Sequence, residues 1–162
     1  MTLHRSPIPA GVLWAAFVVL SPAPAQALEV VGFVSEARPA IWRTGVGVTL
    51  TSGFFRLASL EAEISRQPGE PVESSMTSFT GSALLSPPLG PLVPFGGFGV
   101  GLYRQSRGEL RDNGTLKAFI LGVKLKLGGV VVIRGEYRAI DLSGGALLEM
   151  DERFALGIGV SF

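Results

Sequence analysis

The chain has 162 residues, contains no Cys and has a single His, His4. These counts exclude a scaffold held by disulfides and leave little for catalytic or metal sites built on Cys and His. Apart from Arg5 near the start, 13 Lys and Arg residues balance 13 Asp and Glu residues, so the charge gives no reason to expect a nucleic-acid partner.

Residues 1–27 have the composition of a secretory signal peptide. A charged head at His4 and Arg5 is followed by an apolar run and then by a short segment rich in Pro and Ala that ends at Ala27. The apolar run has about a dozen residues, fewer than the roughly 20 that a transmembrane helix needs. We therefore expect cleavage after Ala27 and one mature domain, residues 28–162, which contains no His.

The mature sequence alternates between bulky apolar residues and small or polar residues, which is the period of a β-strand with two different faces. Eight segments show this pattern and are expected to be strands: 29–37, 42–52, 55–66, 75–85, 92–104, 115–127, 130–140 and 154–162. Short connections rich in Gly or Pro follow the second, fourth and sixth segments. Longer polar connections follow the third, fifth and seventh: 66–74, 105–114 and 141–150. Short and long links in alternation predict an all-β, antiparallel, up-and-down transmembrane barrel.

The alternation alone does not say which face points outward, because a soluble lipocalin-like barrel has the same period with its apolar face inside. An eight-stranded barrel has little interior volume, so small residues suit the inside better than large ones. We therefore expect the bulky face to meet lipid, with Trp42 at its edge. In the last strand the bulky residues on this face are Phe154, Leu156, Ile158, Val160 and Phe162.

Seven charged residues then fall on the inward face. They are Glu61, Glu63, Lys124, Lys126, Arg134, Glu136 and Arg138. The favoured interpretation is a fixed network of ion pairs that fills the barrel, and the alternative is an ion-pair gate in a narrow pore. Glu61 and Glu63 resemble the carboxylate pair of glycosidases only in number, since a substrate could not reach them inside a narrow barrel. We predict no catalytic, metal-binding or cofactor-binding residues.

Four arginines fall in the expected outer connections or beside them: Arg66, Arg104, Arg107 and Arg111. Their guanidinium groups suit the phosphates of lipopolysaccharide. Loops at this end would also be the surface for a host or envelope protein. The alternative is that these charges are simply solvated.

Three segments resemble strands of the small outer-membrane β-barrel family that includes the OmpA and OmpX barrels: 94–103, 134–138 and 153–162. The resemblance covers the second half of the chain by motif and the first half only by pattern and strand count. It implies a barrel-only protein in the outer membrane of a Gram-negative bacterium. In that family an alternating last strand with a terminal aromatic is the signal read by the barrel-assembly machinery, and the bulky residues from Phe154 to Phe162 match it.

The sequence thus predicts a non-enzymatic integral outer-membrane barrel with a structural or surface-interaction role, in contact with lipid and lipopolysaccharide. Lipid-modifying enzymes of similar size use a His, which residues 28–162 lack. Two alternatives stay open. One is a narrow pore for ions or small solutes, and the other is a soluble secreted barrel that binds an apolar ligand.

Overall fold

The computed structural model describes residues 28–39, 42–55, 57–70, 74–87, 89–143, 146–147 and 149–162, so the expected signal peptide lies outside the described residues. The strands are β1 (Leu28–Arg38), β2 (Gly45–Phe55), β3 (Ala58–Pro68), β4 (Ser74–Leu85), β5 (Leu92–Arg107), β6 (Leu110–Leu127), β7 (Val131–Ser143) and β8 (Glu152–Ser161). Within these ranges no helix is long and apolar enough to cross a membrane.

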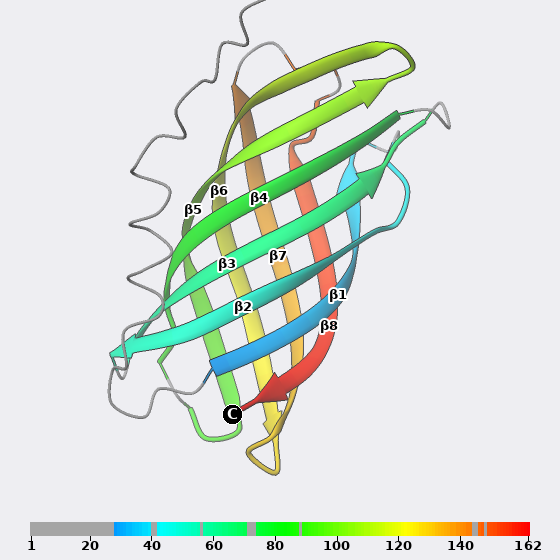
Figure 1. Cartoon of the computed structure of the whole chain (residues 1–162). Coiled ribbons are helices and arrows are strands. Elements are labelled where there is room, and N and C mark those ends of the chain that lie inside the picture. The colour runs from blue at the N-terminus through cyan, green and yellow to red at the C-terminus, as the bar shows by residue number, and fades with distance from the viewer. Residues whose placement is uncertain are drawn as a thin grey trace, which may run out of the picture.

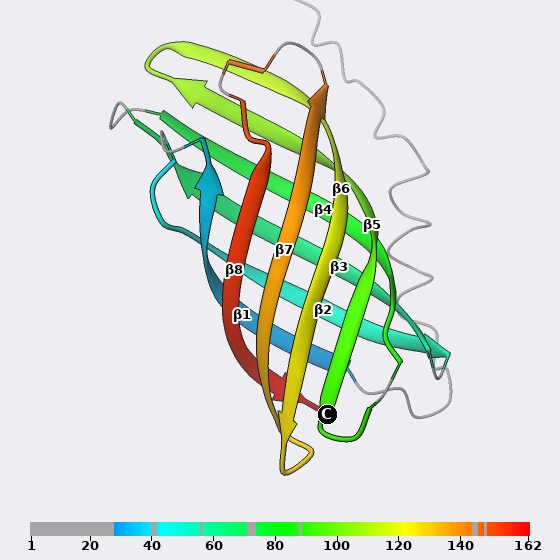
Figure 2. The same cartoon turned by 180° about the vertical axis from the view of Figure 1, so that it is seen from behind.

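Each strand pairs antiparallel with the next, and β8 pairs with β1, so the sheet closes (Figure 1, Figure 2). The predicted eight-stranded antiparallel barrel is confirmed. A path perpendicular to the strands leaves β1 at Leu28 and returns to β1 at Arg38, ten residues further along. A stagger of this kind tilts the strands by about 35–45° from the barrel axis.

The two ends of the barrel differ. At one end Leu28 and Phe162 exchange backbone hydrogen bonds, and the tight turn at Gly128 and Gly129 joins β6 to β7. We call this the terminal end. At the other end the β5–β6 hairpin projects from the barrel (Figure 1), and we call it the hairpin end. All connections that the sequence predicts to be long lie at the hairpin end.

The β5–β6 connection is shorter than the sequence predicts. We expected a polar link over 105–114, but the strands continue until only Gly108 and Glu109 separate them. Gly108 has a φ of 60°, which glycine adopts without strain, and backbone pairing continues up to Arg107 and Leu110. Polar side chains on both faces do not stop a strand whose backbone hydrogen bonds continue.

Side chains sort by face as the alternation predicts. The outward face carries large apolar groups that the chain leaves uncovered, such as Phe98, 70% exposed, and Ile158, 66% exposed. The inward face carries buried hydroxyls and ionised groups, of which Arg138 is 1% exposed. This distribution is the reverse of a water-soluble protein, whose large apolar side chains lie inside.

The interior also holds aromatic rings, which the sequence analysis did not place there. Each of three inward rings stands opposite a glycine of the neighbouring strand: Phe33 faces Gly47, Phe95 faces Gly122, and Tyr103 faces Gly114. A Cβ at Gly122 would lie 2.3 Å from Cζ of Phe95. The missing side chain of the glycine therefore makes the room that the ring occupies.

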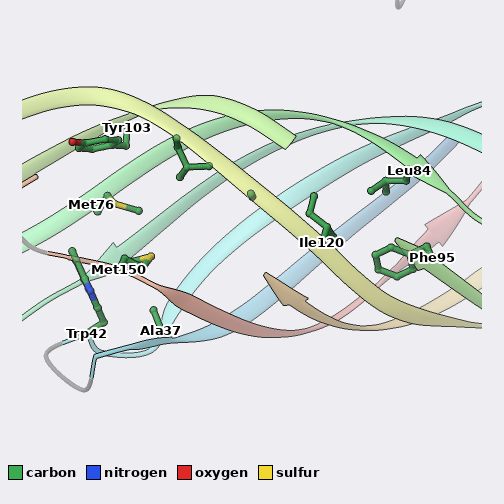
Figure 3. Close-up of a cluster of buried hydrophobic side chains, with 10 residues drawn as sticks. Ala37, Trp42, Met76, Leu84, Phe95, Tyr103, Ile120 and Met150 are labelled. Carbon is green, nitrogen blue, oxygen red and sulfur yellow. The ribbon is translucent and has the colours of Figure 1, made fainter. Parts of the chain in front are cut away.

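Trp42 was predicted to face outward, and this prediction is wrong. β2 begins only at Gly45, and Trp42 forms an isolated bridge with Gly69 while its ring points into the barrel. Its indole Nε1 donates a hydrogen bond of 2.8 Å to the carbonyl oxygen of Glu149. It joins a buried apolar group at the hairpin end, which we call the apolar plug (Figure 3): Ala37, Trp42, Met76, Tyr103, Leu116 and Met150.

Candidate functional site

The middle of the barrel interior is filled by six ionised side chains. We call them the central cluster: Glu61 and Glu63 of β3, Arg134, Glu136 and Arg138 of β7, and Arg153 of β8. All six are buried. Because β3 and β7 are four strands apart in a sheet of eight, they lie on opposite walls, and their inward side chains meet across the interior.

Arg138 is the centre of this cluster. Its Nη2 lies 2.9 Å from Glu61 Oε1 and 2.7 Å from Glu63 Oε2, and its Nε donates to Glu136. Arg138 therefore contacts all three carboxylates. Removing its charge would leave three carboxylates to two arginines.

Arg153 and Arg134 complete the pairing. Arg153 meets Glu63 with both terminal nitrogens, at 2.7 and 2.9 Å, in the two-pronged geometry that guanidinium and carboxylate groups share. Arg134 donates to both Glu61 and Glu136. Each carboxylate of the cluster thus contacts at least two arginines, and three negative charges balance three positive ones.

A second, smaller group lies toward the terminal end. Glu29 of β1 is 2.5 Å from Nζ of both Lys124 and Lys126 of β6. Lys124 is buried, whereas the Lys126 side chain is 30% exposed. The Phe95 ring contacts cations of both groups, with Lys124 Nζ 5.4 Å and Arg134 Cζ 4.4 Å from its centroid.

The structure places all seven predicted inward charges in these two groups. It adds Glu29 and Arg153, which the sequence analysis missed. Arg153 could have been found, because it shares the alternation of Ala155 and Gly157 on the small-residue face of the last strand. Glu29 gave a weaker signal, since its neighbours on the same face, such as Phe33, are themselves large.

Two cavities inside the barrel are each about 10 Å³ in volume. One lies between the central cluster and the apolar plug, beside Glu63, Arg138 and Met150, and the other lies beside Phe33 and Glu136. A volume of about 10–15 Å³ holds roughly one water molecule. Neither cavity is large enough for a substrate or a hydrated ion.

The central carboxylates are paired with arginines of the same cluster, which leaves them unsuited to bind an outside ligand. Glu61 and Glu63 both lie within ion-pair distance of Arg138 and a second arginine. Among the described residues no group of His, Cys, Asp and Glu side chains could hold a metal ion. The chemistry that this arrangement supports is charge neutralisation inside a filled barrel.

The residues predicted to form an assembly signal lie on the outward face of β8 or directly after it. Phe154, Leu156, Ile158, Val160 and Phe162 are all exposed. The Phe154 ring packs against Tyr137 of β7, with ring centroids 5.0 Å apart.

The four arginines predicted for the outer connections lie on strands instead. Arg66 belongs to β3, Arg104 and Arg107 to β5, and Arg111 to β6, and all four side chains are exposed. Strands extend further at the hairpin end than the sequence suggests, so the arginines lie on the sheet rather than in loops.

No protein-family model and no curated relative matches the chain. Several solved structures match it in fold. Neisserial surface protein A superposes with a TM-score of 0.63 at 13% identity, over 84% of this chain and 95% of that one. The N-terminal β-barrel domain of Pseudomonas aeruginosa OprF gives 0.56 at 17%, over 84% and 97%. The Yersinia pestis outer membrane protein Ail, solved in a phospholipid bilayer nanodisc, gives 0.57 at 11%, over 85% and 100%.

The chain has the fold of a small outer-membrane barrel. At these identities the likeness concerns the outer-membrane barrel fold alone, and it extends over nearly all of each matched chain. Closure, strand number and antiparallel order agree with what the sequence predicts.

Proposed function

We propose that this protein is an integral β-barrel of the outer membrane of a Gram-negative bacterium, related to the OmpA and OmpX barrels, with a structural and surface-interaction role and no catalytic activity. The observation that carries the proposal is the distribution of side chains between the two faces. Every strand exposes large apolar groups outward, while buried ion pairs fill the middle.

This distribution favours lipid over water as the surroundings of the barrel. Water-soluble monomers rarely expose a continuous apolar surface of more than a few hundred Å², whereas here the apolar face runs around the whole sheet. A closed sheet also leaves no unpaired edge in hydrocarbon. A soluble carrier would need an apolar cavity inside, but the interior around Arg138 is ionised and filled.

The direction of the chain follows from the same proposal. The terminal end, with its tight turns, would face the periplasm, and the hairpin end would face the outside. Residues 1–27 would direct export, with cleavage after Ala27.

The outward residues of β8 that end at Phe162 would be read by the barrel-assembly machinery. Deletion of Phe162 is therefore expected to reduce the amount of folded protein in the outer membrane.

The first test is heat modifiability of the full chain on a denaturing gel. A closed, hydrogen-bonded barrel resists the detergent until it is heated, so boiled and unboiled envelope samples are expected to run at different positions. The band should remain with the outer-membrane fraction after a carbonate wash. Coincident bands together with recovery in the soluble fraction would contradict the proposal and favour a soluble barrel with a bound apolar ligand.

A narrow pore is the alternative function, and the interior geometry argues against it. The central cluster and the apolar plug fill the barrel, and the two interior cavities described above are each about the size of one water molecule. Planar-bilayer recordings of the refolded chain are therefore expected to show no discrete conductance steps. Steps that disappear in Glu61→Ala or Arg138→Ala would overturn the filled interior and establish an ion-pair gate.

A further inference from the structure

Charged residues on the outward face of the barrel are segregated by sign. On the described outward positions of β3 to β6 there are four cations, Arg66, Arg104, Arg111 and Lys117, and no Asp or Glu. The outward face of β7, β8 and β1 carries three acids, Asp141, Glu152 and Glu36, with one cation, Arg38. A surface that only needed solubility would mix the two signs.

Two of the four cations belong to a continuous row. The strand register sets Arg66 beside Thr77, Thr77 beside Arg104, and Arg104 beside Asn113. We call these four residues the basic row. Neighbouring strands are about 4.8 Å apart, so the backbones at Arg66 and Arg104, two strands apart, are separated by about 10 Å.

The guanidinium of Arg104 is held in place. Its Nε donates a hydrogen bond of 3.0 Å to Oδ1 of Asn113, which orients the group along the sheet. Among the described residues no acidic partner takes its two terminal nitrogens or those of Arg66. Within the described part of the chain, the terminal nitrogens of both arginines are therefore donors that an anion from outside could use.

The basic row borders the apolar face directly. On β3, β4 and β5, the next outward positions toward the terminal end are occupied by Ile64, Phe79 and Leu102. Each of these side chains is more than half exposed. An amphiphile that lies along these strands would place an acyl chain against the apolar residues and an anionic headgroup against the arginines.

We propose that the basic row binds the phosphate groups of outer-leaflet lipopolysaccharide, with Arg66 and Arg104 as the anchoring residues. The inference rests on the proposed outer-membrane location. Guanidinium groups bind phosphate through paired, charge-assisted hydrogen bonds. Thr77 and Asn113 add polar groups between and beside the two arginines. No Asp or Glu stands on the described outward positions of β3 to β6 to oppose the attraction for phosphate.

The test measures binding of lipid A to the refolded full chain in a neutral detergent, by native mass spectrometry or titration. Diphosphorylated lipid A and lipid A stripped of phosphate are compared on the wild type, on Arg66→Gln with Arg104→Gln, and on Arg38→Gln. The control, Arg38→Gln, removes one positive charge from the hairpin end of β1, where Arg38 stands opposite Glu152. A second double variant, Arg66→Lys with Arg104→Lys, keeps the charge but loses the forked geometry.

We expect the double Gln variant to bind diphosphorylated lipid A at least tenfold more weakly, the Lys variant to fall between, and Arg38→Gln to match the wild type. The difference between variants should shrink at high salt. Equal affinity of wild type and double Gln variant, or equal affinity of the wild type for the two lipids, would overturn the proposal. So would a loss of cross-linked dimers in the double Gln variant without a change in lipid affinity, since the row would then contact a second copy.

A gel of boiled and unboiled samples accompanies each titration. A variant that keeps the heat-dependent shift is folded, so weak binding by it reports the site. A wild type without the shift would instead refute the proposed membrane barrel, independently of the lipid result.

Discussion

Replacing Arg138 by Met is expected to lower the free energy of unfolding by about 3–5 kcal/mol, the usual cost of removing one partner from a buried ion pair. Arg138 contacts Glu61, Glu63 and Glu136, and all of these groups are buried. Met fills similar space but offers no charge, so three carboxylates would be left with two arginines. The loss comes from the uncompensated buried charge rather than from lost packing.

Urea unfolding in lipid vesicles, followed by the heat-dependent gel shift, measures this loss. Two variants act as controls. Arg38→Met removes an exposed arginine and should change stability by less than about 1 kcal/mol. The double variant Arg138→Met with Glu136→Gln leaves two carboxylates with two arginines and should recover part of the loss. A single variant as stable as the wild type would show that water reaches the cluster, which favours the pore.

Replacing Gly122 by Ala is expected to cost about 1–3 kcal/mol, as overpacked interiors do. The added Cβ would lie 2.3 Å from the Phe95 ring and 2.5 Å from the carbonyl oxygen of Gly135. Ring and strand would both have to move, in an interior that is already filled by the charged groups around Phe95.

Gly135→Ala is the matched control for this prediction. Gly135 occupies an outward position on the neighbouring strand, β7, and no atom lies within 4 Å of the Cβ that would be added. Both substitutions remove one glycine from a strand, so the unfolded chain loses similar freedom in each. Equal stability of the two variants in thermal unfolding would contradict the ring-over-glycine packing, and Phe95→Leu should partly rescue Gly122→Ala.

The sequence was sufficient to predict the closed barrel because each strand has an apolar outward face and a polar or small inward face, which imposes a strict alternation. The same constraint identified the inward charges, since ionised residues such as Glu61 and Arg134 interrupt a run of small residues on one face. The alternation did not predict the strand ends that lie beyond the apolar face. Beyond the apolar face the residues on both sides of a strand are polar, so the continuation of β5 to Arg107 left no mark in the hydropathy.

Packing between strands was the other part that the sequence did not reveal. Phe33, Phe95 and Tyr103 are large and apolar, and a pattern of bulky against small residues sends such groups outward. Only the register shows that each one faces a glycine. Trp42 was misplaced for the same reason, because its position depends on Gly69, which is far away in the sequence.

The central cluster joins parts of the chain that are 73 to 90 residues apart. β3 brings two glutamates, and the β7–β8 pair brings three arginines and one glutamate, so the two walls carry opposite net charges of equal size. In the proposed membrane location, either wall alone would take uncompensated charge into hydrocarbon, whereas closure of the sheet joins the two walls in a central cluster with no net charge. On the proposed function, insertion of a half-formed barrel would be penalised, and the two walls would enter the bilayer together.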